Sequence, residues 1–259
     1  MRKSLPNEKI IRSLLSSPAP IGIFVLDEVD STNKEARRYC GEGCNLPMLF
    51  VAREQTAGRG RLGRSFVCER DKGLYMTLAL APRDGATPHS LTLAAGCAVL
   101  SAIRDLTGVT PKIKWVNDIL IEDKKVAGIL AEGAFDAGGN MSFAAVGIGV
   151  NINKMHFPKE LSKKAGTLVE LTGKAPDINT LAAEIVNRFL ALSLDMNTVL
   201  DTYKEHLSTL GKHITVTGGG EDFAALAKDL DCGGNLIVER EDGTEEKIFF
   251  GEVSVITRE

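Results

Sequence analysis

The sequence predicts an α+β fold, in which one mixed, mainly antiparallel sheet with packed helices is followed by a small C-terminal β-barrel. Strand-like and helix-like stretches alternate over the first four fifths of the chain. Three strand-like stretches between residues 112 and 151 are separated only by short polar turns, which is typical of an antiparallel meander. From Gly211 on, short β stretches with turns that contain Gly and Asp indicate a separate all-β unit.

The composition is that of an ordinary globular protein. The chain has 259 residues, of which 44% are hydrophobic and 25% are charged, and its net charge is -3. This charge excludes a polycation that binds nucleic acid with its whole surface. No apolar run approaches the ~18 residues of a membrane span, and residues 1–20 lack the features of a secretory signal. We therefore expect a cytoplasmic protein without a membrane partner.

The cysteines and histidines do not predict a metal site. The five cysteines are odd in number and irregular in spacing, which favours thiols over disulfides. Cys40 and Cys44 are close enough to hold a metal together, but no His or second Cys pair follows at zinc spacing. We therefore expect no metal bound by protein side chains alone.

The first elements follow from local patterns. We expect a strand at residues 21–29 and a helix at 34–39, where Thr32 and Glu35 have the spacing of a capping box. A short strand is expected at 49–52. After it, the glycine-rich residues 57–64 cannot form regular structure.

The middle of the chain carries the clearest elements. Residues 73–80 alternate as a strand does, and the apolar spacing of 90–106 predicts a buried helix that ends at Gly108. The meander consists of three strands joined by polar turns at 122–124 and 136–140. The three strands are expected at 112–121, 125–131 and 142–151.

Two helices and four short strands complete the chain. The helices are expected at 178–193 and 197–209, where the apolar residues recur at about the helical period. We place the domain boundary near residue 210, which gives a domain of residues 1–210 and a barrel of residues 211–259. The strands of the barrel are expected at 212–217, 235–240, 246–250 and 252–256.

The sequence AGRGRLGR at residues 57–64 is the strongest local feature. Concentrating Arg59, Arg61 and Arg64 costs energy unless an anion neutralises them. Arg binds carboxylate and phosphate with two parallel hydrogen bonds, and glycines let a ligand approach the backbone. The alternatives are a solvated surface loop and a nucleic-acid patch. The segment has neither the P-loop pattern nor that of a dinucleotide-binding turn.

A second candidate segment lies between residues 112 and 130. Taken singly, Asn117 and Asp118 are explained by turn chemistry, and Lys125 by a solvated hairpin lysine. Taken together with Lys114, they put a carboxylate and two lysines beside apolar strands. Such a set suits a reaction between anions.

Two further segments have both a structural and a functional explanation. Gly147 and Gly149 fall on one face of an apolar strand, where a flat ring could pack, although a core strand with a bulge is the alternative. Ser31, Thr32 and Asn33 offer donors and acceptors at a helix start, which suits a small polar group such as a urea. The alternative there is a simple helix cap.

In this order, the four segments resemble the catalytic domain of biotin protein ligases. The resemblance spans roughly residues 21–256, and the arginine loop and the lysine–tryptophan segment together are highly specific. It implies a class II synthetase-like catalytic domain followed by an SH3-like barrel. The matching motifs are Ser31-Thr32-Asn33, Gln55 to Arg64 (QTAGRGRLGR), Lys114 to Asp118 (KWVND), Lys125, and Gly147 to Asn153 (GIGVNIN).

The resemblance implies a two-step reaction. Biotin and ATP, with Mg²⁺, form biotinyl-5′-AMP, and the biotin is then transferred to a lysine of a biotin carboxyl carrier protein. A homodimer is compatible with it. Two family layouts exist, one of which has an N-terminal DNA-binding domain of about 60 residues. Since Ser31 lies early in this chain, we expect no DNA partner, and a gel shift on operator DNA tests this.

The resemblance also implies roles for individual residues. Lys125, Asp118, Arg59 and Arg61 are the implied catalytic residues, with Asp118 where the acceptor lysine enters. The biotin site is implied to consist of Ser31, Thr32, Asn33, Gln55, Arg59, Gly60, Arg61 and Lys125. The nucleotide site is implied to consist of Arg61, Arg64, Phe66, Lys114, Asn117 and Asn151.

Two residues depart from the family pattern. Val116 replaces the usual proline, so we expect a less rigid strand end. Phe66 replaces the usual tryptophan that covers the adenine, and it offers less area and no N–H. We expect weaker nucleotide packing without loss of activity.

Three other functions are alternatives to a biotin protein ligase. A lipoate ligase shares the fold and the adenylation chemistry but has a different glycine–arginine motif. A nucleic-acid-binding module is disfavoured by the net acidity and the lack of interleaved aromatic residues. A sensor that binds biotin without turnover has no need for Lys125 and Asp118.

Overall fold

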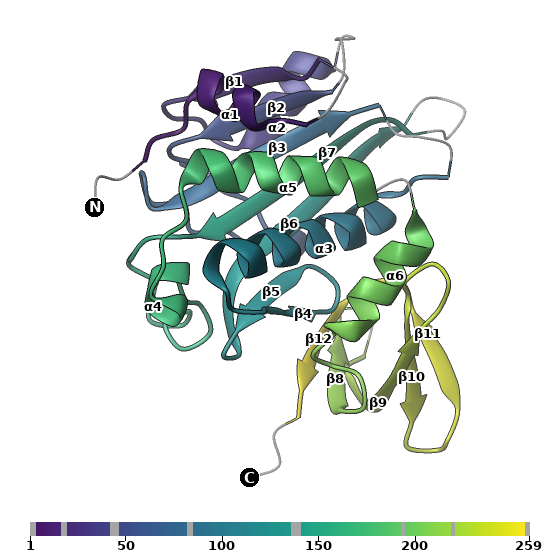
Figure 1. Cartoon of the computed structure of the whole chain (residues 1–259). Helices are drawn as coiled ribbons and strands as arrows, with labels where there is room; N and C mark the ends of the chain where they lie inside the picture. Colours follow the sequence, from purple (N-terminus) through teal and green to yellow (C-terminus); the bar gives the residue numbers. More distant parts are fainter. Residues whose placement is uncertain are drawn as a thin grey trace.

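A seven-stranded mixed sheet runs through the larger part of the protein (Figure 1), for which we use a computed structural model. The strand order is β1-β2-β3-β7-β6-β5-β4, and only the edge pair β1–β2 is parallel. The strands are β1 (Gly22–Leu26), β2 (Met48–Ala52), β3 (Gly73–Leu80), β4 (Lys112–Lys114), β5 (Asp118–Ile121), β6 (Lys124–Phe135) and β7 (Met141–Asn151). The structure describes residues 4–16, 20–41, 47–81, 85–135, 141–192, 195–218 and 221–256.

The two faces of this sheet are covered by different helices. Successive residues of a strand point to opposite faces, so on β2 Leu49 and Val51 join the main core while Met48 and Phe50 belong to a smaller cluster with α2 (Thr32–Cys40). The main core includes the long helices α3 (Pro88–Thr107) and α5 (Ile178–Leu192), which lie side by side over the sheet in Figure 1. The face that α2 covers only in part is the one that carries the candidate site.

Helix α3 begins and ends as its sequence predicts. Thr87 and Ser90 form a capping box at its start, and Gly108 ends it in the left-handed conformation, with φ 78°. By length and composition alone α3 could cross a membrane, but 72% of its apolar window is buried inside this protein. It is therefore the central core helix of the larger domain.

A second, five-stranded antiparallel sheet follows α6 (Met196–Glu205), in agreement with the predicted all-β C-terminal unit. Trp115 Nε1 donates a hydrogen bond to the carbonyl oxygen of Gly234 at 3.1 Å, which joins the two sheets. The boundary near residue 210 stays a prediction. The strands are β8 (His213–Thr217), β9 (Phe223–Leu230), β10 (Leu236–Arg240), β11 (Glu245–Ile248) and β12 (Glu252–Val255), in the order β11-β10-β9-β8-β12.

Several predicted elements are wrong in extent. The stretch 112–121 is not one strand but the hairpin β4–β5, because residues 115–117 turn the chain; the Trp115–Val116 peptide bond is cis. The strand expected at 21–29 ends at Leu26, and the helix expected at 197–209 ends at Glu205.

Some elements were not predicted at all. Strand β9 has the sequence FAALAKDL, whose residues are mostly weak strand formers, and it exists because β8 and β10 pair with its two edges. Two short helices were also missed: α1 (Glu8–Leu14) and α4 (Leu168–Thr172). The predicted turn at 136–140 and Cys44 of the rejected metal pair lie outside the described residues.

Candidate functional site

A cavity opens on the α2 face of the large sheet. A pocket with apolar walls and a few polar groups is typical of small-molecule sites. Nine of the residues predicted from the sequence line it: Ser31, Thr32, Asn33, Gln55, Arg59, Gly60, Phe66, Asn117 and Lys125. The structure thus brings together residues from α2, the glycine–arginine loop, the β4–β5 turn and β6.

At one end of the cavity lies a buried network of neutral polar groups. Gln55 Oε1 accepts hydrogen bonds from the backbone N–H and the hydroxyl of Thr32, at 2.7 and 3.0 Å. Thr77 Oγ1, from β3, lies 2.8 Å from Thr32 Oγ1 and 2.6 Å from Asn33 Oδ1. Thr77 is fully buried, and Thr32 and Asn33 are 3% and 5% exposed. Such a network holds its members in one geometry, because any broken bond leaves a buried polar group unpaired.

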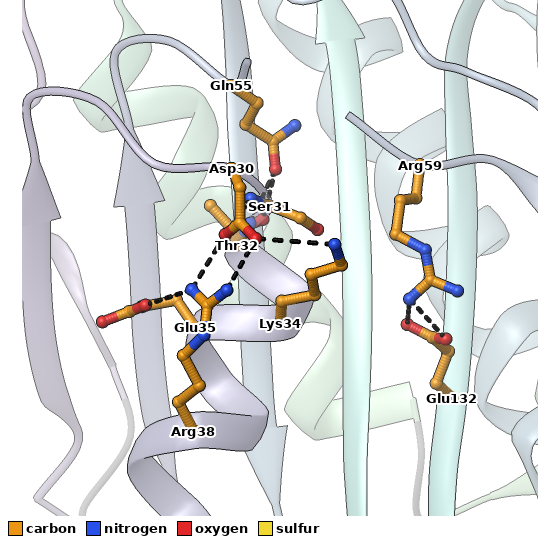
Figure 2. Close-up of polar contacts among 9 residues, drawn as sticks. All are labelled: Asp30, Ser31, Thr32, Lys34, Glu35, Arg38, Gln55, Arg59 and Glu132. Atoms are coloured by element: carbon orange, nitrogen blue, oxygen red, sulfur yellow. Dashed lines mark hydrogen bonds and ion pairs between the residues drawn. The ribbon is translucent and has the colours of Figure 1, made fainter. Parts of the chain in front are cut away.

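The capping box predicted for α2 is wrong. Ser31 is the N-cap residue and makes no side-chain cap, while the Thr32 hydroxyl is engaged by Gln55 and Thr77. Glu35 instead forms an ion pair with Arg38 (Figure 2). The Ser31 hydroxyl makes no hydrogen bond within the described chain, although Ser31 lines the cavity. It is therefore open to a ligand.

Asp30 anchors the start of α2 from outside the cavity (Figure 2). Its carboxylate accepts two hydrogen bonds from Arg38, at 2.9 and 2.6 Å, and one from the backbone N–H of Ser31. The Arg38 guanidinium is the main reason that the pKa of Asp30 falls to about 2. Asp30 thus fixes the segment that carries Ser31 and Thr32 without touching the cavity.

Cys68 also belongs to this hydrogen-bond network. Gln55 Nε2 lies 2.9 Å from Cys68 Sγ. Burial raises the pKa of the Cys68 thiol to about 12. Cys68 is therefore a packing and hydrogen-bonding residue and not a thiolate nucleophile.

Two arginines of the glycine–arginine loop form ion pairs with other parts of the protein. Arg59 donates two hydrogen bonds to the Glu132 carboxylate, at 3.0 and 3.3 Å (Figure 2). The loop then turns through the short 3-10 helix η1 (Arg61–Gly63), where Gly63 has φ 75°. Beyond it, Arg64 pairs with Glu252 of the C-terminal sheet at 2.7 Å. The loop is thus attached to both sheets, through the first and the last of its three arginines.

Arg61 differs from its two neighbours. It makes no ion pair with any described residue and does not line the cavity. Partial burial lowers the pKa of its guanidinium, while the charges of Glu252 and Asp118 oppose that shift. The guanidinium stays charged at neutral pH, so Arg61 is a cation near the site that has no ion-pair partner among the described residues.

Lys125 and Asp118 form the tightest ion pair beside the cavity. Lys125 Nζ lies 2.6 Å from Asp118 Oδ1 and 5.8 Å from the centre of the Phe66 ring. Lys114 lies opposite Asp118 in the β4–β5 pair, so the two side chains share a face of the sheet. The structure therefore gathers the predicted carboxylate and both lysines in one place.

The glycines of β7 are needed for close packing, as expected. A Cβ on Gly147 would lie 2.3 Å from Asn33 Oδ1, and one on Gly149 would lie 2.6 Å from the Phe66 ring. The ring that packs on this face is thus the protein's own Phe66. Larger residues at either position would displace a wall of the cavity.

Five predicted residues do not line the cavity: Arg61, Arg64, Lys114, Asp118 and Asn151. Asn151 is 3% exposed, and its Nδ2 donates to the Gly166 carbonyl at 3.1 Å, while its Oδ1 has no partner in the described chain. Thr77 and Glu132 were missed. Both could have been noticed as single polar residues within or just after predicted apolar strands.

The described ranges contain no group of three or more His, Cys, Asp or Glu residues placed to hold a metal ion.

Two family models match the chain. The Biotin/lipoate A/B protein ligase family matches residues 28–151, and the Biotin protein ligase C terminal domain matches residues 209–255. Biotin--[acetyl-CoA-carboxylase] ligase of Mycobacterium tuberculosis is 30% identical over 226 residues, which are 83% of this chain and 82% of that protein. Bifunctional ligase/repressor BirA of Bacillus spizizenii is 32% identical over 241 residues, which are 88% of this chain and 72% of that protein.

Solved structures agree with these sequence matches. Biotin protein ligase from Aquifex aeolicus in complex with biotin and ATP superimposes with a TM-score of 0.79, at 28% identity, over 92% of this chain and 99% of that one. The match extends over both sheets, as the two family models do. The chain belongs to the biotin protein ligase family.

Proposed function

We propose that this protein is a biotin protein ligase: it makes biotinyl-5′-AMP from biotin and ATP and transfers the biotin to a lysine of a carrier domain. The observation that carries the proposal is the two-ended cavity, with neutral hydrogen-bonding groups near Gly147 at one end and Lys125 near Gly149 and Gly128 at the other. Biotin has the same division, a neutral urea at one end and a carboxylate at the other. ATP supplies the second anion.

The buried end of the cavity would hold the ureido ring. The Ser31 hydroxyl is open to a ligand, and Thr32 and Asn33 are already held in place by Thr77 and Gln55. A site built to hydrogen-bond a polar group strongly rejects an analogue without that group. This argues against lipoate, whose dithiolane ring has no urea.

The cationic end would carry the first step. A carboxylate oxygen of biotin attacks the α-phosphorus of ATP, the bond from that phosphorus to the bridging oxygen breaks, and pyrophosphate leaves. Both reactants are anions, so Lys125, Arg59 and Arg61 would neutralise the charge that builds up between them. Gly60, which lines the cavity, leaves room for the backbone to approach the ligand.

Arg61 and five further residues are proposed to bind the nucleotide. Phe66 and Asn117 line the cavity and would contact the adenosine. Asn151 Oδ1, which has no partner in the described chain, is an acceptor suited to the adenine amino group. Arg64 and Lys114 would contact the phosphates from outside the cavity, and Mg²⁺ would accompany those phosphates.

The glycine–arginine loop would shield the product of the first step. Biotinyl-5′-AMP is a mixed anhydride that water destroys, so the site must exclude water until the acceptor arrives. The ion pairs of Arg59 and Arg64 are partly exposed, with side-chain exposures of 44% and 67%, and can exchange for ligand anions at low cost.

Asp118 would act in the second step. The amine of the acceptor lysine must lose a proton before it attacks the acyl carbon and releases AMP. The Asp118 carboxylate could orient that amine or take up its proton, and Lys125 holds the carboxylate in place at 2.6 Å.

Several finer statements stay predictions. The acceptor is expected to be the carrier domain of acetyl-CoA carboxylase or of a related carboxylase, since two relatives are named as ligases that act on acetyl-CoA carboxylase. A cytoplasmic location, a homodimer and the lack of a DNA or membrane partner also stay predictions.

Purified protein with biotin, MgATP and a carrier domain tests the proposal. Mass spectrometry should detect biotinyl-5′-AMP without the carrier and one biotin on a single lysine with it, whereas lipoate should give neither product. Failure to form the adenylate and to label the carrier would overturn the proposed function.

A further inference from the structure

Glu132 links the neutral network to the glycine–arginine loop, and the proposed reaction gives it no role. Its Oε2 accepts a hydrogen bond from Asn33 Nδ2 at 2.8 Å, and both of its oxygens accept from Arg59 Nη1, at 3.0 and 3.3 Å. Figure 2 shows the Arg59 guanidinium meeting this carboxylate directly. A single carboxylate thus joins the neutral network to the glycine–arginine loop.

The two sides of this link differ in rigidity. Asn33 is 5% exposed, its Oδ1 lies 2.6 Å from the Thr77 hydroxyl, and it packs against Gly147 without room for a Cβ. Arg59 belongs to an irregular loop, and 44% of its side chain is exposed. Glu132 itself lies on β6, within the large sheet. Glu132 therefore attaches the exposed start of the loop to the large sheet and to Asn33, while Arg64 attaches the end of the loop to Glu252.

Both oxygens of Glu132 are already engaged by the protein. They accept from Asn33 and Arg59, so Glu132 is assigned to positioning and not to proton transfer. Asp118, the carboxylate assigned to proton handling, is paired with Lys125 instead. Glu132 and Asp118 therefore have different roles in the reaction.

We propose that Glu132 is a positioning residue: it holds Arg59 over the cavity and couples the biotin-binding network to closure of the glycine–arginine loop. The inference rests on the proposed function. Without a ligand, Glu132 balances the charge of Arg59 and keeps the start of the loop near its closed position. When biotin fills the buried end, Asn33 and Glu132 hold Arg59 where it covers the activated intermediate. Loss of the link frees the loop, and the intermediate escapes more often.

Glu132→Gln is the most informative variant, because the amide oxygen can still accept from Asn33 while the charge that holds Arg59 is lost. Glu246→Gln is a matched control, since Glu246 pairs with Arg240 at 2.6 Å far along the C-terminal sheet. Arg59→Ala and the double variant complete a cycle. In the Arg59→Ala background, Glu132→Gln should have no further effect.

The first measurement needs neither ligand nor activity. Trypsin cuts after arginine, so the rate of cleavage after Arg61 and Arg64, followed by mass spectrometry, reports how free the loop is. Loss of one charge-assisted bond should speed cleavage in Glu132→Gln by about fivefold relative to wild type and to the control. Equal cleavage rates in all three proteins would overturn the proposal.

The second measurement follows the escape of the intermediate. We expect Glu132→Gln to release biotinyl-5′-AMP into solution, or onto lysines of serum albumin, about tenfold faster, with the KM for biotin within about twofold of wild type. A residue with a merely structural role would change KM and kcat together without raising escape. An unchanged escape rate contradicts the proposal. If the wild-type protein makes no adenylate, the proposed function fails, while the proteolysis result still decides whether Glu132 holds the loop.

Discussion

The two ends of the cavity satisfy their polar groups in opposite ways. At the neutral end, Thr32, Asn33 and Thr77 are at most 5% exposed and bond to one another. At the cationic end, Lys125 is 32% exposed and pairs with a carboxylate of the protein, as Arg59 of the neighbouring loop does at 44% exposure. The first end is held in a single geometry, whereas the second holds its charges in pairs that a ligand can replace.

This difference matches what each end would have to do. A urea is recognised by groups that are already in place, because rearranging a buried network leaves bonds unmade. A reaction between two anions needs cations directed at the charge that develops, and partly solvated ion pairs can exchange their protein carboxylates for those anions. Variants at the charged end should therefore change rates, and variants at the neutral end should change affinity.

The largest effect is expected at Lys125. Lys125→Ala should slow adenylate formation by about 10³-fold, because it removes the cation next to the reacting anions. Biotin-dependent exchange between ATP and pyrophosphate measures this step. Lys112→Ala is the control, since Lys112 is exposed on β4. Nearly normal exchange in Lys125→Ala would show that Lys125 does not neutralise the reacting anions.

Asp118 separates the two steps of the reaction. Asp118→Ala should slow transfer to the carrier by about 10²-fold, because the acceptor amine loses its proton acceptor, while adenylate formation changes little. Single-turnover assays with preformed biotinyl-5′-AMP isolate the transfer step. Hydroxylamine is uncharged at neutral pH, so it should react with biotinyl-5′-AMP in Asp118→Ala at the wild-type rate. Equal losses in both steps would mean that Asp118 acts by holding Lys125.

Thr77 tests the neutral end. Thr77→Val keeps the shape but removes the hydroxyl that holds Thr32 and Asn33, so the KM for biotin should rise by about tenfold with kcat nearly unchanged. Thr77→Ser should restore affinity. A fall in kcat without a rise in KM would show that the two ends are not separate in function.

Phe66 lies at the border between the two ends. Its ring packs on Gly149, and Phe66→Ala should raise the KM for ATP by about fivefold through lost ring packing, with the KM for biotin changed less. Steady-state kinetics with each substrate varied in turn measures both values. A larger increase in the KM for biotin than in the KM for ATP would show that the Phe66 ring contacts biotin and not the nucleotide.

The smallest effect is expected at Asp30, outside the cavity. Arg38 lowers the pKa of Asp30 from 3.8 to about 2, so its contribution to stability is present above about pH 4 and is lost as the pH falls toward 2. Asp30 is 29% exposed, so after discounting for solvent Asp30→Asn should cost about 1 kcal/mol of unfolding free energy at pH 7. Thermal melts should show the difference from wild type shrinking between pH 4 and pH 2. A constant difference across that range would contradict the assignment to the Asp30 charge.

Much of the fold follows from local pattern. The strand at 73–80 and the helix ending at Gly108 are observed as expected, because their apolar spacing and end signals agree with their burial. Strand β9 was missed because its alanines, lysine and aspartate have low strand propensity, and pairing with two neighbours overrides that preference. The spacing of Thr32 and Glu35 predicts a local cap, because spacing alone cannot reveal that Gln55 and Thr77 lie near Thr32.

By itself, the sequence determined which chemical groups this protein has for its ligands: a Ser-Thr-Asn helix start, three arginines among glycines, and a carboxylate with two lysines in one strand region. Only the tertiary structure decided how those groups are paired, with Lys125 on Asp118, Arg59 on Glu132, and Thr77 between Thr32 and Asn33. The physical reason is that ion pairs and buried hydrogen bonds join residues far apart in the chain, and their partners are chosen by the register of strands and the packing of helices.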